Sequence, residues 1–272
     1  MSRKVSLIVH GSLVEREMPD ACSEVLPGVI WGDPWTLFTP AYWLAQAWMS
    51  EIDTRPSGRY SVKHGLIGEL GFCLLGGFGI TAELATAAYD RCWQAGLFLR
   101  YETRPEAWVA ELSEPLQVGS RKIRYRYPNQ KSRFLAAAME YVQHNELRTD
   151  SGMALREQLL NINGVGYKIA SWVARNALDS DEVAILDIHL LRAGRLCGLF
   201  SPRHRVERHY KEMEALYLLF SEKLQIRPAA LDCLIWEDMR SAGSLPLRLL
   251  DPQANSQMSM RFMTIDSNQS PA

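Results

Sequence analysis

A short glycine turn between two amphipathic patterns constrains this chain more than any other stretch. Apolar residues recur at helical spacing on both sides of Gly164-Val165-Gly166, upstream over 155–162 and downstream over 169–178. Glycine allows backbone angles that side chains forbid. Glycines at a helix N-terminus also leave its amides open to an anion. This pattern predicts a helix-hairpin-helix motif, whose turn can hold a nucleic-acid phosphate.

A lysine and an aspartate follow this turn at informative positions. Lys168 lies two residues past the turn, in the first turn of the second helix, and the apolar run 183–186 leads to Asp187. We expect Asp187 to cap a helix that begins at Ile188. Such a pair offers a carboxylate that can stabilise positive charge and an amine that can form a Schiff base with a carbonyl-like centre. The alternatives are an exposed helix lysine and a purely structural cap.

These residues resemble the helix-hairpin-helix DNA glycosylases and, within them, the 8-oxoguanine DNA glycosylases. The family signature is a leucine-proline-glycine-valine-glycine hairpin, a lysine two residues on, and an aspartate about nineteen residues later that is followed by valine and histidine. Here those places hold 162–166, Lys168 and 186–189. The departure is Asn163 in place of proline, which affects turn rigidity more than chemistry.

The resemblance implies a mainly α, two-subdomain helical glycosylase fold with a short β element at the N-terminus, expected at 5–9. At 47% hydrophobic and 22% charged residues the composition is that of a globular protein. We expect residues 1–60 to form an irregular and helical segment that packs on a glycosylase core at 61–250, with 251–272 as a disordered tail. Helices are expected over 40–49, 65–76, 81–95, 129–144, 203–220 and 228–240.

Two segments outside the hairpin are predicted to touch DNA. Residues 76–79 read GGFG between two apolar helices, and by resemblance Gly77 and Phe78 belong to a loop that fills the gap left by an extruded base. The alternative is a close helix crossing. Six basic residues and no acid lie over 121–133, where clustered positive charge favours phosphate. The alternative is a solvated face. The predicted backbone contacts in this run are Arg124, Arg126, Lys131 and Arg133.

Three further residues are site candidates by resemblance. His189 matches a family histidine near the phosphate at the lesion, although a lone histidine is also common in cores and on surfaces. Trp236 could stack on a flipped purine and Asp232 could bond its edge. The alternatives are core packing for Trp236 and surface exposure for Asp232.

Composition limits cofactors and partners. The five cysteines form no C-x-x-C pair, so we expect neither zinc nor an iron–sulfur cluster. By resemblance a monovalent cation could bind near Gly164 and Gly166; otherwise no cofactor is expected. The net charge is −1, so local patches must supply affinity for DNA. No signal peptide or bilayer-spanning run is evident. We expect a monomer in the cytoplasm, at the nucleoid, or in the nucleus of a eukaryote.

The leading interpretation is a DNA glycosylase and abasic-site lyase. It would excise a damaged purine such as 8-oxoguanine from double-stranded DNA by base flipping, with Lys168 and Asp187 as catalytic residues. One alternative is a non-catalytic DNA-binding module, against which the lysine and aspartate argue. The other is a glycosylase-like protein that acts on a different modified purine in bacterial antiviral defence.

Overall fold

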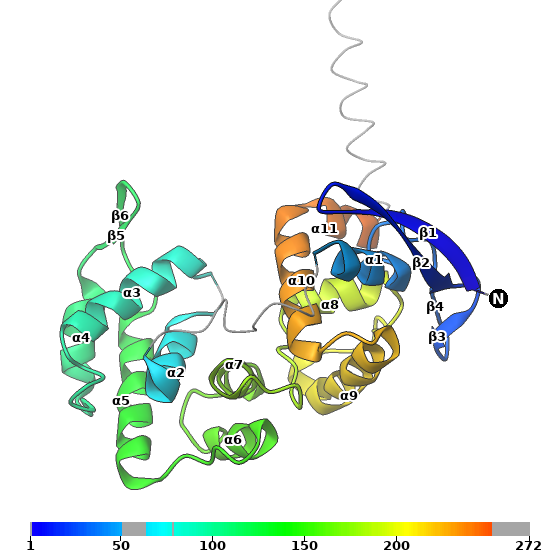
Figure 1. Cartoon of the computed structure of the whole chain (residues 1–272). Coiled ribbons are helices and arrows are strands. Elements are labelled where there is room, and N and C mark those ends of the chain that lie inside the picture. Colours follow the sequence, from blue (N-terminus) through cyan, green and yellow to red (C-terminus); the bar gives the residue numbers. More distant parts are fainter. Residues whose placement is uncertain (1, 51–63, 78, 252–272) are drawn as a thin grey trace, which may run out of the picture. The chain divides into compact units, whose positions relative to one another are not determined.

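The computed structural model describes residues 2–50, 64–77 and 79–251. They fall into two compact units: unit 1 comprises Met1–Arg55 and Leu186–Ala272, and unit 2 comprises Pro56–Ile185. Both units are mainly helical, and short strands lie at the N-terminus (Figure 1), which confirms the predicted fold class. Over these described ranges, no helix has the length and apolarity needed to span a membrane.

The division into units differs from the expected one. The last third of the expected 61–250 core, from Leu186 onward, belongs to unit 1, together with the N-terminal segment. The reason is tertiary packing, because helix α1 (Pro40–Ser50) packs against α10 (Pro228–Ser241). Nearly all of the expected tail, from 252 onward, lies outside the described residues.

Unit 1 begins with two β-hairpins, where the sequence predicted irregular structure and one strand. Strands β1 (Ser2–Val9) and β2 (Ser12–Pro19) pair in antiparallel fashion around His10 and Gly11, both of which have positive φ. A second hairpin joins β3 (Glu24–Leu26) and β4 (Val29–Ile30). The alternation that marks a strand is weak in β2, because Met18 is its one buried residue.

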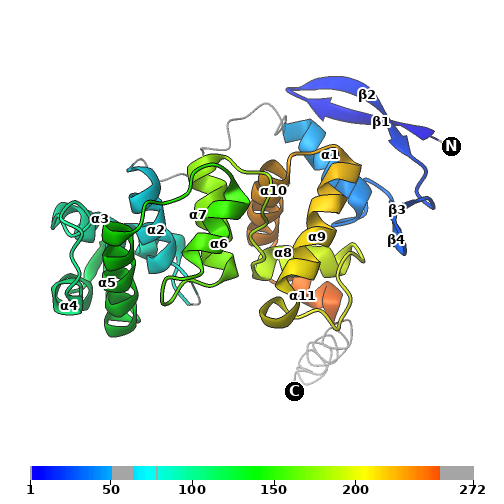
Figure 2. The same cartoon turned by 90° about the horizontal axis from the view of Figure 1, so that it is seen from below.

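Helix α8 (Ile188–Leu196) is one of the helices of unit 1 that pack on α10. This helix contacts α10 and α11 (Leu245–Leu250), and α10 contacts α9 (Val206–Leu224) (Figure 2). Large side chains such as Trp43, Phe200 and Tyr217 are buried here.

Unit 2 contains the helical hairpin. Helix α6 (Gly152–Leu159) packs on α7 (Tyr167–Leu178), and α7 packs on α2 (Gly65–Leu75). On the side of α2 away from α7 lie α3 (Ala82–Gln94), α4 (Pro105–Ser113) and α5 (Pro128–His144) (Figure 1). Strands β5 (Leu116–Val118) and β6 (Arg121–Ile123) form a small hairpin. Several helix starts follow from caps, such as Thr81 on α3 and Ser151 on α6.

Candidate functional site

The turn at 164–166 joins α6 to α7, as predicted. The amide of Val165 donates to the Ile162 carbonyl at 3.0 Å, and both side chains are buried. Gly164 has a φ of +90°, and a Cβ atom there would overlap the ring of Phe134, so both conformation and packing require glycine. Gly166 is exposed and a Cβ atom on it would meet nothing within 4 Å. The backbone at Gly166 is therefore open to a ligand.

Lys168 lies in the first turn of α7, as predicted, and is partly buried. The N-cap of α7 is Gly166, which has no side chain to cap the helix. The ammonium nitrogen of Lys168 lies 6.0 Å from the ring centroid of Trp172, one turn later on the same helix. Trp172 in turn makes an edge-on contact with Phe72 of α2, with ring centroids 6.1 Å apart. An aromatic side chain therefore flanks the candidate nucleophile and ties α7 to α2.

Asp187 is the N-cap of α8, which confirms the structural part of its prediction. One carboxylate oxygen, Oδ1, accepts the amides of His189 at 2.8 Å and Leu190 at 2.9 Å. The apolar run 183–186 before it is buried, so the position of the carboxylate is fixed from both sides. Lys168 belongs to unit 2 and Asp187 to unit 1.

The structure brings two of the three other candidates into contact within unit 1. The rings of His189 and Trp236 meet edge to face, with centroids 6.2 Å apart. Asp232 lies one turn before Trp236 on α10 and is 8% exposed, which excludes the alternative of a surface aspartate. The guanidinium of Arg240 lies 5.0 Å from the centroid of the Trp236 ring. The roles of these residues in base recognition stay predictions.

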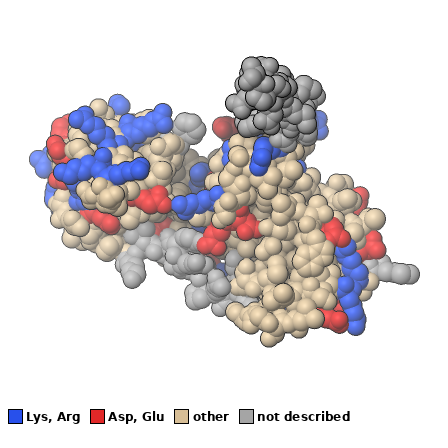
Figure 3. Space-filling model, turned by 90° about the horizontal axis from the view of Figure 1, so that it is seen from above, with Lys and Arg blue, Asp and Glu red and all other residues tan. Residues whose placement is uncertain are grey.

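The basic segment, defined as residues 121–133, contains both exposed and buried cationic side chains. Arg124, Arg126 and Arg133 are exposed, which leaves their guanidinium groups accessible. Figure 3 shows Lys and Arg side chains gathered on the face of unit 2 seen from above. Lys131 departs from the prediction: it is 8% exposed and its ammonium donates to the carbonyls of Leu74, in the last turn of α2, and Gly76, its C-cap. The structure therefore removes Lys131 from the predicted DNA contacts.

The glycine segment, defined here as Gly76, Gly77 and Gly79, follows α2. Gly77 and Gly79 are exposed and have φ values of +121° and +72°. These positive values explain why glycine stands at both positions. Phe78, which the sequence predicted as the residue that fills the gap in the duplex, lies outside the described residues. Of the two residues predicted to belong to the loop that fills the gap in the duplex, only Gly77 is among the described residues.

The approach of Trp172 to Lys168 and the bonds of Lys131 to the end of α2 were not predicted from the sequence. Trp172 could have been found, because it stands four residues after Lys168 and side chains at this spacing share a helix face. The role of Lys131 left no local signal, since its partners lie more than 50 positions earlier in the chain. Among the described residues, no group of three or more His, Cys, Asp or Glu side chains could hold a metal ion.

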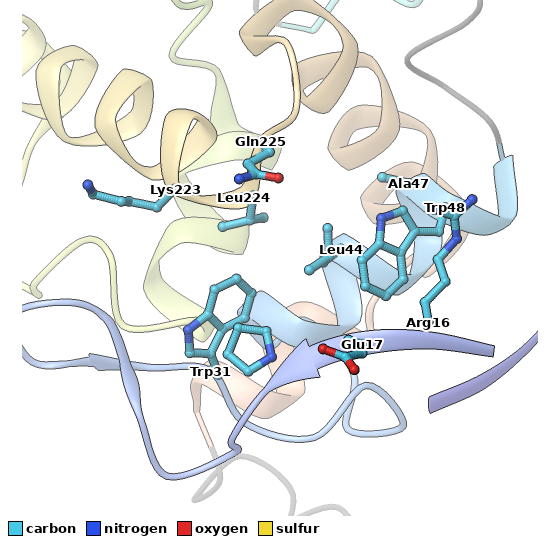
Figure 4. Close-up of a pocket in the computed structure, with 10 residues that line it drawn as sticks. Arg16, Glu17, Trp31, Leu44, Ala47, Trp48, Lys223, Leu224 and Gln225 are labelled. Atoms are coloured by element: carbon cyan, nitrogen blue, oxygen red, sulfur yellow. The ribbon is translucent and has the colours of Figure 1, made fainter. Parts of the chain in front are cut away.

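A separate pocket of about 540 Å³ lies in unit 1. Trp31, Leu44 and Trp48 supply apolar walls, while Arg16 and Lys223 bring positive charge from β2 and α9 (Figure 4). None of the predicted site residues lines it. This pocket is therefore distinct from the residues that carry the candidate chemistry.

Comparison with known protein families identifies the family of this chain. The family model of the 8-oxoguanine DNA glycosylases with a helix-hairpin-helix matches residues 57–226, which is more than half of the chain. The chain belongs to this family. The matched range includes the hairpin, Lys168 and Asp187, and it extends across parts of both units. The resemblance read from the signature residues is thus confirmed for the 8-oxoguanine DNA glycosylase family.

Curated 8-oxoguanine DNA glycosylase/AP lyases of archaea are similar to this chain. An 8-oxoguanine DNA glycosylase/AP lyase of Saccharolobus islandicus is 33% identical over 124 residues, which covers 42% of this chain and 58% of the relative. One of Korarchaeum cryptofilum is 28% identical over 182 residues, covering 63% of this chain and 78% of the relative. The first of these matches thus spans less than two thirds of the length of the relative.

Among solved structures, the 8-oxoguanine DNA glycosylase of Methanocaldococcus jannaschii is similar to this chain. It shares 24% sequence identity and has a TM-score of 0.48, with 68% of this chain and 80% of the other covered.

Proposed function

We propose that this chain is a DNA glycosylase with abasic-site lyase activity that removes a damaged purine of the 8-oxoguanine type from double-stranded DNA. The observation that carries the proposal is the uncapped N-terminus of α7, where exposed Gly166 precedes Lys168 within a helical hairpin. Asp187 supplies a fixed carboxylate at the start of α8. Membership of the 8-oxoguanine DNA glycosylase family supports the same conclusion.

Lys168 and Asp187 would act on the same bond in different ways. The target base must leave the stack before its sugar can be reached. As the bond between C1′ and the purine nitrogen breaks, the electron pair leaves with the base, and the Asp187 carboxylate stabilises the positive charge that develops on the sugar. The neutral amine of Lys168 bonds to C1′, and the proton that the resulting ammonium releases is taken up by the departed base. Opening of the sugar ring gives a Schiff base, from which β-elimination can nick the strand.

Backbone amides and arginines would hold the DNA. The open amides at the N-terminus of α7, after Gly164 and Gly166, suit a phosphate, because helix N-termini attract anions. A monovalent cation held by the hairpin carbonyls belongs to the same proposal. Exposed Arg124, Arg126 and Arg133 would contact other phosphates.

Two more sets of residues complete the proposed interface. The bare backbone at Gly77 permits close approach of the duplex. His189 would lie near the phosphate at the lesion, and Asp232 and Trp236 would recognise the extruded purine by a hydrogen bond and by stacking.

Borohydride trapping tests the proposal directly. The full chain is mixed with duplexes that each contain one modified purine, 8-oxoguanine among them, and borohydride reduces any Schiff base to a stable adduct. We expect an adduct and base release with at least one oxidised purine. Binding to every duplex without base release or adduct would show a non-catalytic DNA-binding module. A preference for a non-oxidised modified purine would overturn the assigned substrate class and leave the chemistry intact.

A further inference from the structure

The C-terminal end of α2 is closed by two side chains of the basic segment. The ammonium of Lys131 donates to the carbonyls of Leu74 at 2.6 Å and Gly76 at 2.7 Å. The hydroxyl of Tyr125 donates to the carbonyl between them, that of Leu75, at 2.5 Å. The last carbonyls of a helix have no partner within it, so these two buried side chains satisfy three consecutive acceptors.

The same segment also contacts the exposed glycines that follow. A Cβ atom on Gly77 would lie 3.6 Å from the ammonium of Lys131, and one on Gly79 would overlap the guanidinium of Arg126. The amide of Ile80 closes the turn by donating to the Gly77 carbonyl at 3.1 Å. The buried ammonium of Lys131 therefore lies beside Gly77, and the exposed guanidinium of Arg126 lies beside Gly79.

This anchored backbone is connected to the helix that carries Lys168. A Cβ atom on Gly76 would lie 3.6 Å from the ring of Trp172. The ammonium of Lys168 lies 6.0 Å from the centroid of the same ring. Burial and, after it, the charge of Lys168 lower the pKa of Lys131 to about 8. Lys131 therefore lies within the electrostatic reach of Lys168.

We propose that Lys131 is a positioning residue that fixes the backbone at Gly76 and Gly77 so that it meets DNA in one conformation next to α7. This inference rests on the proposed glycosylase function and names a residue that acts without touching the substrate. A buried ammonium is costly unless its surroundings compensate it. Here the compensation comes from two carbonyls and the negative end of a helix, all of which belong to the peptide units that lead into the glycine segment.

Lys131→Met tests this role, because it keeps the apolar part of the side chain at similar length and removes its donors and charge. Two single-turnover reactions of the full chain are compared: excision from a duplex containing 8-oxoguanine, and borohydride trapping on a duplex with a preformed abasic site. An abasic site has no base to extrude from the stack. We expect excision to fall about tenfold or more, the scale of misplacement from a distance, while trapping changes by less than about threefold.

Two further variants make the result decisive. Tyr125→Phe removes one of the three hydrogen bonds and should show the same split to a smaller degree, which decides the question if Lys131→Met does not fold. Ser221→Ala is the matched control, because Ser221 also donates from a buried side chain to a backbone carbonyl, that of Ile226 at 2.6 Å. It should leave both reactions unchanged.

The outcomes separate the inference from the proposed function. Equal losses in both reactions that follow the fall in Tm would show a merely structural lysine and overturn the inference, as would unchanged excision. If the wild-type chain gives neither excision nor adduct, the proposed function fails and the inference falls with it. Wild-type activity without a split in the variants overturns the inference alone.

Discussion

The first residues of α7 and α8 offer a comparison between two helix N-termini of nearly identical backbone geometry. The N-cap of α7, Gly166, has φ −101° and ψ 177°, and that of α8, Asp187, has φ −100° and ψ −176°. At α8 the carboxylate accepts two amides, whereas no side chain caps α7. The two N-termini thus differ by one side chain: α8 carries its own anion, and we expect the amides of α7 to accept an anion from outside.

The largest expected effect comes from removing the amine next to the open N-terminus. Lys168→Gln should still bind lesion DNA, because the amides of α7 remain, yet lose adduct formation by more than about 10³-fold, as expected for a nucleophile. Gel analysis of borohydride-treated mixtures measures the adduct. Lys4→Gln, which changes an exposed lysine of β1, is the control. An adduct that forms in Lys168→Gln at the wild-type rate would mean that another amine is the nucleophile.

Removing the charge of Asp187, the N-cap of α8, should have the next largest effect. Asp187→Asn keeps an oxygen that can accept the amides of His189 and Leu190 but removes the charge. Base release should fall about 10²-fold while the affinity for DNA changes little, since a lost electrostatic stabiliser acts on the transition state. Single-turnover excision and a binding titration separate the two quantities.

A cap without its charge and a missing cap can be told apart. Asp187→Ala should cost about 1 kcal/mol of folding free energy in addition to the catalytic loss, whereas Asp187→Asn should unfold near the wild-type Tm. Excision by Asp187→Asn at the wild-type rate would reduce Asp187 to a structural cap, and α7 and α8 would then differ in stability rather than in catalysis.

Exposed arginines test whether the open amides hold DNA alone. Arg124→Ala combined with Arg126→Ala should weaken binding to every sequence about tenfold and reduce the slope of log affinity against log salt by about 2, close to 0.9 for each lost phosphate contact. Binding titrations over a range of salt concentrations give this slope. Arg148→Ala, which removes an arginine paired with Asp150, should leave it unchanged. Equal slopes in the double variant would make the basic segment a solvated face.

The parts of this fold that local spacing encodes were predictable. The helical hairpin, the position of Lys168 in α7 and the cap at Asp187 all followed from apolar periodicity and cap residues within a few positions. The N-terminal hairpin was missed because charged residues interrupt the alternation in β2. The irregular segment expected before α1 therefore proved to be paired strands.

What could not be predicted depends on partners far away in the sequence. Lys131 looked like one more cation of an exposed run, and its burial follows from carbonyls of α2 that lie 55 and 57 positions earlier. The division into units likewise depends on α1 packing against α10. A charged side chain reveals such a role only when its tertiary partners are known, because its residue type suggests exposure.

The smallest expected effect comes from converting the open N-terminus into a closed one. Gly166→Asp places at α7 the residue that caps α8, in a backbone conformation that Asp187 already adopts, and the open space around Gly166 leaves room for it. The new cap should stabilise the fold by a few tenths of a kcal/mol. Its charge should weaken DNA binding about two- to fivefold, the scale of 0.3–1 kcal/mol at a helix terminus. Gly166→Ser, which caps without charge, separates the two terms. Stronger or unchanged DNA binding by Gly166→Asp would show that no phosphate uses the amides of α7, and the contrast between the two N-termini would then carry no function.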